Sequence, residues 1–336
     1  MKEGSVAGAL ARSSVLVVGA GGLGSPAALA LARAGVGCIG VADDDRVELS
    51  NLQRQLLHGT PDLGRPKVDS ARERLLELNP ALQVEVHPVH LVAGNILPIL
   101  EGYDLVVEGS DNLPTKFLVN DAAYFARKPA VIAAVLRFFG QLLVVRPGEG
   151  PCYRCLFRSL PPADVTPSCQ EAGVLGAVPG ILGGLQAAEA VKLLAGGHAA
   201  PGGEPTLPGP PGQRGLERRG PSRSGPVAGV GEPLREAIFL ADALTGRYER
   251  VEVRRNPECP LCGQNPRITA LEEENYRHPP ATEPERESPL GWSPGAEGGS
   301  REVGSPGCPV APATEPERES PFLSSSGPGG GLRGVG

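Results

Sequence analysis

The chain has 336 residues and a formal net charge of −6, from 32 basic and 38 acidic side chains. This charge argues against a direct nucleic-acid platform, and the length allows one sizeable hydrophobic core. No apolar run approaches the about 20 residues of a membrane span, and no signal-peptide pattern opens the chain, so a cytosolic protein without a membrane partner is expected. Seven cysteines, an odd number, do not predict a secreted disulfide framework.

The first motif is a glycine-rich turn between a strand and a helix. The apolar residues 15–18 are typical of a buried parallel strand, and residues 19–24 contain four glycines. An alanine-rich helix over 23–34 would direct its free N–H groups toward an anion. A second strand over 38–42 ends at Asp43, where a carboxylate can meet ribose hydroxyls. This order of strand, glycine turn, helix, strand and acid predicts a nucleotide pocket, and it does not identify the nucleotide.

Strand and helix patterns alternate through the first half of the chain. The expected strands lie near 82–86, 104–108, 130–134 and 138–145, and the expected helices near 67–78, 114–126 and 176–195. This alternation predicts an α/β fold with a doubly wound, mostly parallel Rossmann-like sheet. Two further strands, over 236–243 and 248–254, would form a hairpin about residues 245–246.

Composition divides the chain into five parts. Glycine and proline without apolar periodicity predict a disordered insertion, and a proline- and glutamate-rich sequence that occurs at both 280–289 and 312–321 predicts a disordered tail. The expected parts are a short featureless segment (1–12), a nucleotide-binding domain (13–195), the insertion (196–231), C-terminal strands of the same domain (232–270) and the tail (271–336).

Polar clusters lie beside the predicted pocket. Residues 50–55 include an amide and a guanidinium, which suit a polyphosphate, and Lys67 opens the next helix as either a phosphate ligand or a solvated charge. Asp111 and Asn112 follow a strand at the sheet edge where α/β folds bind ligands. Asp111 could bridge to Mg²⁺, or this pair could simply cap the helix that starts near Pro114. Both interpretations stay open.

The cysteines form two C-x-x-C pairs and three single residues. Four thiolates from Cys152, Cys155, Cys259 and Cys262 would satisfy a closed tetrahedral Zn²⁺ site, and the alternatives are a redox pair or unrelated buried thiols. Cys169 lies in a polar loop and is either a nucleophile or an ordinary cysteine. The five histidines are scattered and predict no catalytic or metal constellation.

Taken together, these motifs resemble the MoeB/ThiF family of adenylyltransferases, which are relatives of ubiquitin-activating enzymes. Within that family, the combination of Cys169 with both zinc pairs looks most like the eukaryotic adenylyltransferase and sulfurtransferase of molybdenum cofactor synthesis and tRNA thiolation. The resemblance implies that ATP and Mg²⁺ adenylate the C-terminal glycine of a ubiquitin-like sulfur carrier ending in Gly-Gly. Such carriers are the molybdopterin synthase small subunit and the ubiquitin-related modifier. It also implies a homodimer and a sulfur donor.

The resemblance assigns roles to particular positions. Cys169 would form a thioester or persulfide with the carrier, and Asp111 and Arg54 would act on the developing charge and the phosphates. The implied nucleotide-binding residues are Gly22, Asp43, Ser50, Asn51, Leu52, Gln53, Arg54, Lys67, Asp111 and Asn112.

The sequence departs from the family pattern at both ends and at the insertion. The family's N-terminal Arg-Tyr-Ser-Arg-Gln-like motif is not found in residues 1–12, where only Arg12 carries a guanidinium, and no rhodanese sequence follows residue 271. We therefore expect an adenylation module that cannot supply sulfur by itself. The competing hypotheses are a nicotinamide-dependent oxidoreductase and a scaffold that binds a ubiquitin-like carrier without consuming ATP.

Overall fold

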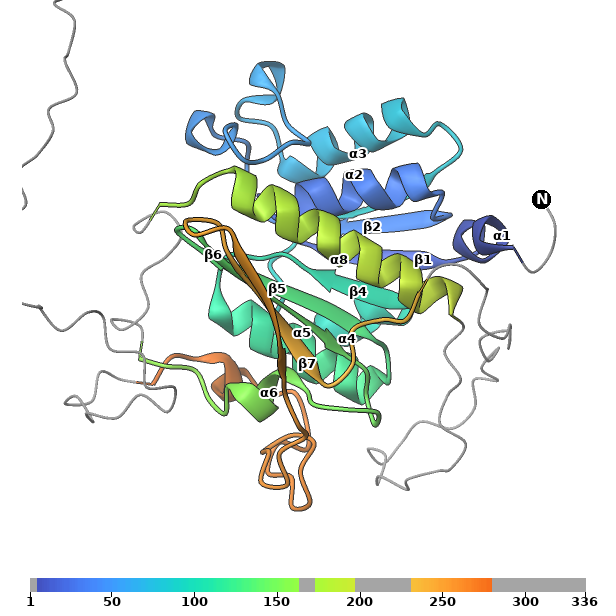
Figure 1. Cartoon of the computed structure of the whole chain (residues 1–336). Coiled ribbons are helices and arrows are strands. Elements are labelled where there is room, and N and C mark those ends of the chain that lie inside the picture. The colour runs from blue at the N-terminus through green and yellow to red at the C-terminus, as the bar shows by residue number, and fades with distance from the viewer. Residues whose placement is uncertain (1–4, 163–172, 197–230, 280–336) are drawn as a thin grey trace, which may run out of the picture. The chain divides into compact units, whose positions relative to one another are not determined.

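Eight strands form one sheet in the computed structural model, which describes residues 5–162, 173–196 and 231–279 (Figure 1). The strand order is β3-β2-β1-β4-β5-β6-β7-β8. Strands β1 to β5 pair in parallel, and β6, β7 and β8 continue the sheet in antiparallel pairs. The bounds are β1 Ser14–Val18, β2 Cys38–Ala42, β3 Gln83–His87, β4 Leu105–Glu108, β5 Ala130–Leu136, β6 Phe139–Val145, β7 Ala237–Asp242 and β8 Arg247–Glu252. The predicted α/β class and mostly parallel sheet are confirmed.

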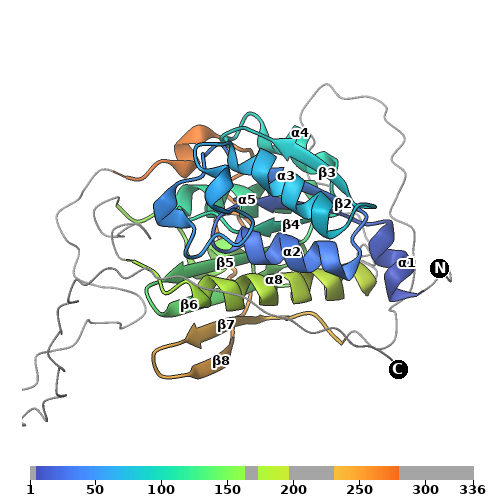
Figure 2. The same ribbon diagram turned by 90° about the horizontal axis from the view of Figure 1, so that it is seen from above.

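Helices cover both faces of the parallel part of the sheet. Helix α8 crosses in front of the strands in Figure 1, and Figure 2 shows it side by side with α2, while α4 and α5 pack on the opposite face. The bounds are α1 Val6–Ala11, α2 Gly24–Ala34, α3 Lys67–Leu78, α4 Ile96–Glu101, α5 Leu113–Ala126, α6 Tyr153–Leu156 and α8 Ala177–Ala195, with short 3-10 helices at Leu49–Asn51, Thr60–Asp62 and Glu273–Tyr276.

Side chains of strand β1 show how the two faces are filled. Val15 and Val17 belong to a hydrophobic cluster with helices α2, α3 and α8, whereas Leu16 and Val18 belong to a second cluster with α4 and α5. Because both faces of the strand are buried, its sequence is continuously apolar and does not alternate. This is why the first strand could be predicted from composition alone.

By length and composition alone, the 19-residue helix α8 would be apolar enough to cross a membrane. Gln186, Glu189 and Lys192 interrupt its apolar sequence. The helix packs on α2, β5 and β6, and its Leu182 and Ala190 are fully buried in the core. A Cβ at Gly183 would overlap the Leu23 carbonyl oxygen, so the small residue allows the close approach of the two helices.

Three segments differ from the sequence-based expectation. Residues 1–12 are not featureless, because Ser5 caps helix α1 by accepting the Gly8 N–H at 3.1 Å. Helix α4 was not predicted, since it is only six residues long and contains a proline. Part of the segment predicted as tail from residue 271 is ordered, because Glu273–Tyr276 forms a 3-10 helix and Tyr276 is buried. The insertion lies almost entirely outside the described residues, as do the repeats and Cys169.

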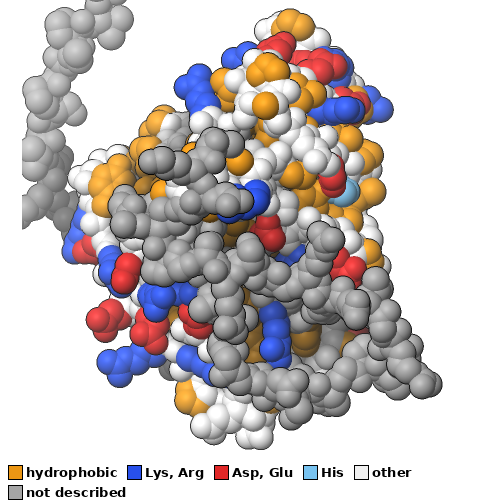
Figure 3. Space-filling view, turned by 90° about the vertical axis from the view of Figure 1, so that its right-hand side faces the viewer, with side chains coloured by type: hydrophobic (Ala, Val, Ile, Leu, Met, Phe, Trp, Pro, Cys, Tyr) orange, Lys and Arg blue, Asp and Glu red, His pale blue; other side chains and the backbone are white. Residues whose placement is uncertain are grey.

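The protein surface carries mixed charge. In the uncovered part of the face shown in Figure 3, basic and acidic side chains lie interspersed, with hydrophobic side chains between them. Exposed pairs such as Arg65–Glu73 and Arg74–Glu77 are examples of this mixing on helix α3 and the loop before it. Water screens such exposed pairs, so they contribute little to the free energy of unfolding.

Candidate functional site

A cavity of 840 Å³ opens at the carboxyl ends of β1, β2 and β4. The strand order reverses between β1 and β4, and such a reversal is where open α/β sheets bind ligands. Six of the predicted nucleotide-binding residues line the cavity: Gly22, Asp43, Arg54, Lys67, Asp111 and Asn112. The cavity lining does not include Ser50, Asn51, Leu52 or Gln53.

The glycine turn after β1 is tightly constrained. Gly19 has a φ of +85°, a conformation that disfavours any side chain, and a Cβ at Gly24 would overlap the Gly19 carbonyl oxygen. The Ala20 N–H donates to Asp43 Oδ2 at 2.7 Å, and the Asp45 N–H donates to Asp43 Oδ1 at 2.9 Å. Burial raises the pKa of Asp43, while Lys67 opposes that rise. The turn and the carboxylate are therefore fixed relative to each other.

Both cations predicted for the site, Arg54 and Lys67, line the cavity, and each is held by a neighbouring side chain. The Asn51 side chain is buried, and its Oδ1 accepts a hydrogen bond from the Arg54 guanidinium at 2.9 Å. Asn51 therefore positions the Arg54 guanidinium, which lines the cavity. Lys67 is 5% exposed and donates to Asp45 Oδ2 at 2.6 Å. Lys67 is therefore not a solvated surface charge.

The loop after β4 gives different positions to its two predicted residues. Asn112 caps helix α5 by accepting the Thr115 N–H at 2.9 Å, which confirms the capping interpretation for that residue. Asp111 is exposed on the cavity wall, and its carboxylate has no hydrogen-bond or ion-pair partner among the described residues. A free carboxylate there is available to a metal ion or a reacting group.

A buried ion pair beneath this loop was missed from the sequence. The Lys116 ammonium donates to Glu108 Oε2 at 2.6 Å, to the Ser110 carbonyl at 2.7 Å and to the Ala133 carbonyl at 2.7 Å. Glu108 also accepts from the Ser110 N–H at 2.9 Å and from its hydroxyl. Burial raises the pKa of Glu108, and the lysine opposes this. The pair holds the backbone next to Asp111.

Two more residues in the region were not singled out by the sequence. Gln55 is 3% exposed, lines the cavity, and leaves its Oε1 without a partner in the described part of the chain. Its place at the end of the 50–55 cluster was the available signal. His58 lies under the glycine turn, hydrogen-bonded to Ala20 and Ser70. The scattered histidines gave no reason to single out His58 from the sequence.

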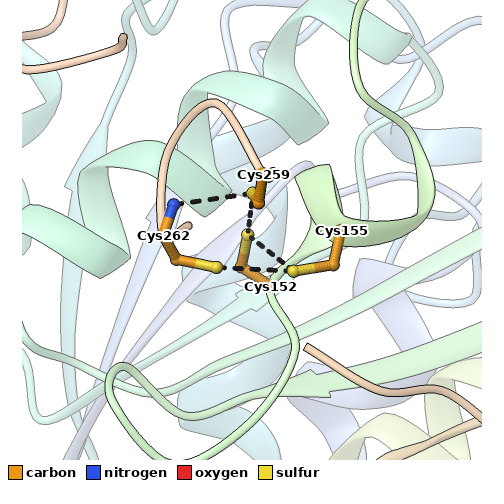
Figure 4. Close-up of side chains that lie close together, drawn as sticks. All are labelled: Cys152, Cys155, Cys259 and Cys262. Carbon is orange, nitrogen blue, oxygen red and sulfur yellow. Dashed lines mark hydrogen bonds between the residues drawn. The ribbon is translucent and has the colours of Figure 1, made fainter. Parts of the chain in front are cut away.

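The two cysteine pairs meet in space (Figure 4). The Sγ–Sγ distances are 3.4 Å for Cys155–Cys262, 3.5 Å for Cys152–Cys259 and 3.9 Å for Cys152–Cys155. All four sulfurs lie within 4.8 Å of one another, so this tetrad could hold a metal ion, and they are too far apart for disulfides. Hydrogen bonding from Cys152 lowers the pKa of Cys155 to about 7.

A buried polar network supports the first cysteine pair. Arg154, between Cys152 and Cys155, donates to both carboxylate oxygens of Asp121 at 2.7–3.0 Å, and Tyr276 donates to the same carboxylate at 3.1 Å. Arg154 is 3% exposed and Asp121 is fully buried. Burial raises the pKa of Asp121, and the guanidinium opposes that rise. The network joins helix α5, the cysteine pair and the 3-10 helix at Glu273–Tyr276.

Replacing Arg154 with Met should lower the free energy of unfolding by about 3–5 kcal/mol, because it leaves the Asp121 carboxylate buried and unpaired. Arg158→Met is the matched control, since the exposed Arg158–Glu258 pair at 3.3 Å is worth less than about 1 kcal/mol. Urea unfolding curves of the two variants make the comparison, and adding Asp121→Asn to Arg154→Met should restore part of the loss. Equal losses in the two arginine variants would contradict this account.

The ThiF family model matches residues 5–261, which is most of the chain. This chain belongs to the ThiF family. As a ThiF family member, it is 46% identical over 262 residues to the "Sulfur carrier protein adenylyltransferase" of Thermus thermophilus, covering 76% of this chain and 84% of that protein. It is 43% identical over 265 residues to the "Adenylyltransferase and sulfurtransferase MOCS3" of Sus scrofa, covering 79% and 51% of the two chains.

The ThiF family member thus spans about half the length of that MOCS3 relative. Among solved structures, it resembles "Crystal structure of E. coli MccB + ATP" with a TM-score of 0.59 and 20% sequence identity, over 77% of this chain and 68% of MccB. That likeness concerns the fold alone, and it agrees with the sheet described above.

Proposed function

We propose that this chain uses ATP to adenylate the C-terminal glycine of a ubiquitin-like sulfur carrier. The observation that carries the proposal is the cavity itself, which brings the glycine turn, two held cations and the free Asp111 carboxylate together at the strand-order reversal. The names of the Thermus and Sus scrofa relatives support adenylation as the reaction and sulfur carriers as the substrates.

The reaction would proceed by attack of the glycine carboxylate on the α-phosphorus of ATP. One carboxylate oxygen forms a bond to phosphorus, the bond to the bridging oxygen breaks, and pyrophosphate leaves with that electron pair. Arg54 and Lys67 would neutralise the phosphate charge, and the free N–H groups of the glycine turn would bind phosphate oxygens. Asp111, whose carboxylate has no partner in the described chain, fits a Mg²⁺ ligand.

We also propose Zn²⁺ as the metal of the cysteine tetrad. Four ligands about 2.3 Å from a tetrahedral zinc lie about 3.8 Å from each other, and the closest sulfurs of the tetrad are 3.4–3.9 Å apart. Four cysteines leave no open position, which is typical of a structural site. Such a metal would join the start of helix α6 to the loop after β8.

The finer assignments follow the family resemblance. The carriers would be the molybdopterin synthase small subunit and the ubiquitin-related modifier, so that the products serve molybdenum cofactor synthesis and tRNA thiolation. A sulfur donor would be a further partner, and the enzyme would act as a cytosolic homodimer. Cys169, the candidate covalent residue, lies outside the described residues.

The test is ATP–pyrophosphate exchange with purified protein, Mg²⁺, labelled pyrophosphate and a carrier ending in Gly-Gly. Label should enter ATP only when carrier is present, because the exchange requires reversible formation of the acyl-adenylate. The matched control is the same carrier without its last glycine, which places the carboxylate one residue short and should give no exchange.

Carrier binding without any exchange would overturn the proposal and favour a scaffold. Binding is therefore measured in parallel, with the same carrier and the same protein preparation. Exchange without carrier would also contradict the proposed substrate, since it would show activation of another carboxylate.

A further inference from the structure

Three side chains hydrogen-bond to the backbone polar atoms of Ala20, in the glycine turn. Its N–H donates to Asp43 Oδ2 at 2.7 Å, and its carbonyl oxygen lies 3.0 Å from His58 Nε2. Ser25 Oγ donates to the same carbonyl at 3.1 Å. Because a trans peptide is planar, a carbonyl held toward His58 aims the following N–H, that of Gly21, in the opposite direction.

The Gly21 N–H is available to a ligand. Gly21 lines the cavity, and its N–H has no hydrogen-bond acceptor within the described residues. A free backbone N–H in a glycine turn before a helix is the kind of group that binds phosphate oxygens. The direction of this donor therefore depends on what holds the Ala20 carbonyl.

The partners of His58 define its protonation. A carbonyl oxygen only accepts, so Nε2 carries the hydrogen, and Nδ1 lies 2.9 Å from Ser70 Oγ. The ring is 8% exposed, and burial lowers its pKa, so that the neutral form donates to Ala20 and accepts from Ser70. The charged groups that act on the ring are Lys67, Asp62 and Asp43.

The contact with Ser70 links the glycine turn to a second part of the cavity. Ser70 is buried in the first turn of helix α3, and Lys67 begins that helix. Residues three apart on a helix lie on the same side. His58 thus connects the backbone of the turn to the helix that carries a cavity cation.

We propose that His58 is a positioning residue for the nucleotide phosphates. It holds the Ala20 carbonyl so that the Gly21 N–H points at a phosphate oxygen, and Ser70 fixes the ring in the required tautomer. This inference rests on the proposed function, in that it takes ATP as the occupant of the cavity.

The test compares His58→Asn with His58→Gln. The Gln amide nitrogen can occupy the place of Nε2 and still donate to Ala20, whereas the Asn amide reaches only the place of Nδ1. His58→Asn should weaken ATP binding about 10-fold, measured by titration calorimetry without carrier, and His58→Gln should recover most of the affinity. In the exchange assay, the KM for ATP should rise in His58→Asn by a similar factor, with kcat changed less.

Ser70→Ala also tests how His58 is held, because it removes the hydroxyl that contacts the His58 ring. It should weaken ATP binding in the same direction by a smaller factor, and its effect should shrink in the His58→Asn background, because both changes release one ring. Circular dichroism and urea midpoints verify that the variants are folded.

Equal ATP affinity of folded His58→Asn and wild-type protein would overturn the inference, as would equal weakening by Asn and Gln. Should His58→Asn fail to fold, an unchanged ATP affinity in Ser70→Ala would overturn it. Because ATP binding is measured without carrier, a wild-type protein that binds ATP and performs no exchange would contradict the adenylation proposal alone.

Discussion

Asp111→Asn should lower carrier-dependent ATP–pyrophosphate exchange by about 100- to 1,000-fold, because it removes a proposed Mg²⁺ ligand and so weakens the metal that would neutralise the charge developing on the phosphates. The carboxylate is exposed in the cavity and has no partner in the described chain, so the substitution removes charge without breaking a structural contact. The free energy of unfolding should therefore stay within about 0.5 kcal/mol of wild type. Exchange rates at saturating ATP, with urea unfolding of the same samples, measure both effects.

Glu77→Gln is the control for Asp111→Asn. It also removes one negative charge from the chain, but Glu77 lies exposed on helix α3, where it pairs with Arg74 at 3.0 Å. Exchange should be unchanged in this variant. An Asp111→Asn protein with more than about a tenth of wild-type activity would exclude a direct part for this carboxylate in the reaction.

Cys259→Ser should remove the metal and lower the midpoint of thermal unfolding by about 10 °C. A serine hydroxyl is a poor replacement for a thiolate, and the tetrad sulfurs, at 3.4–3.9 Å, would lose the ion that holds them together. A loss of about 3–5 kcal/mol in a domain of this size corresponds to a shift of that order. Metal content by mass spectrometry and calorimetric scans make the measurement, with one zinc per wild-type chain expected.

Cys38→Ala is the matched control for the tetrad. Cys38 is a half-buried free cysteine at the start of β2, away from the four ligands. This variant should keep a full complement of zinc. A metal content that is equal in Cys259→Ser and wild type, or absent from wild type prepared under reducing conditions, would show that the tetrad does not bind zinc.

Local patterns predicted most of the sheet. The second strand was expected over 38–42 and is observed over those residues. A short, continuous apolar stretch bounded by a glycine and an aspartate is typical of a buried strand. Helix α3 likewise occupies its expected range. Short elements were harder to predict from the sequence. Helix α1 has six residues and one capping serine, and the 3-10 helix at Glu273–Tyr276 depends on burial of Tyr276. Tertiary packing, which local sequence does not contain, determines such elements.

The candidate site likewise contains residues that the sequence predicts and residues that it does not. Glycines, Asp43 and Asp111 occur in recognisable motifs, so their meeting at one edge could be expected from the order of strands. The Glu108–Lys116 pair and the His58 contact join residues whose types alone indicate ordinary surface groups. Their function depends on burial and on partners from other elements, and neither property is visible in one sequence.

The spacing of the cysteines has a consequence for biosynthesis. Cys152 and Cys259 are 107 positions apart, and strands β7 and β8 lie between them in the chain. On the ribosome, the first pair can offer only two ligands until the second has emerged. Closing so long a loop also carries an entropic cost that earlier strand pairing would reduce. An ion bound by all four cysteines would therefore join the chain late, and a newly made molecule would pass through a metal-free stage in which its thiols are open to oxidation.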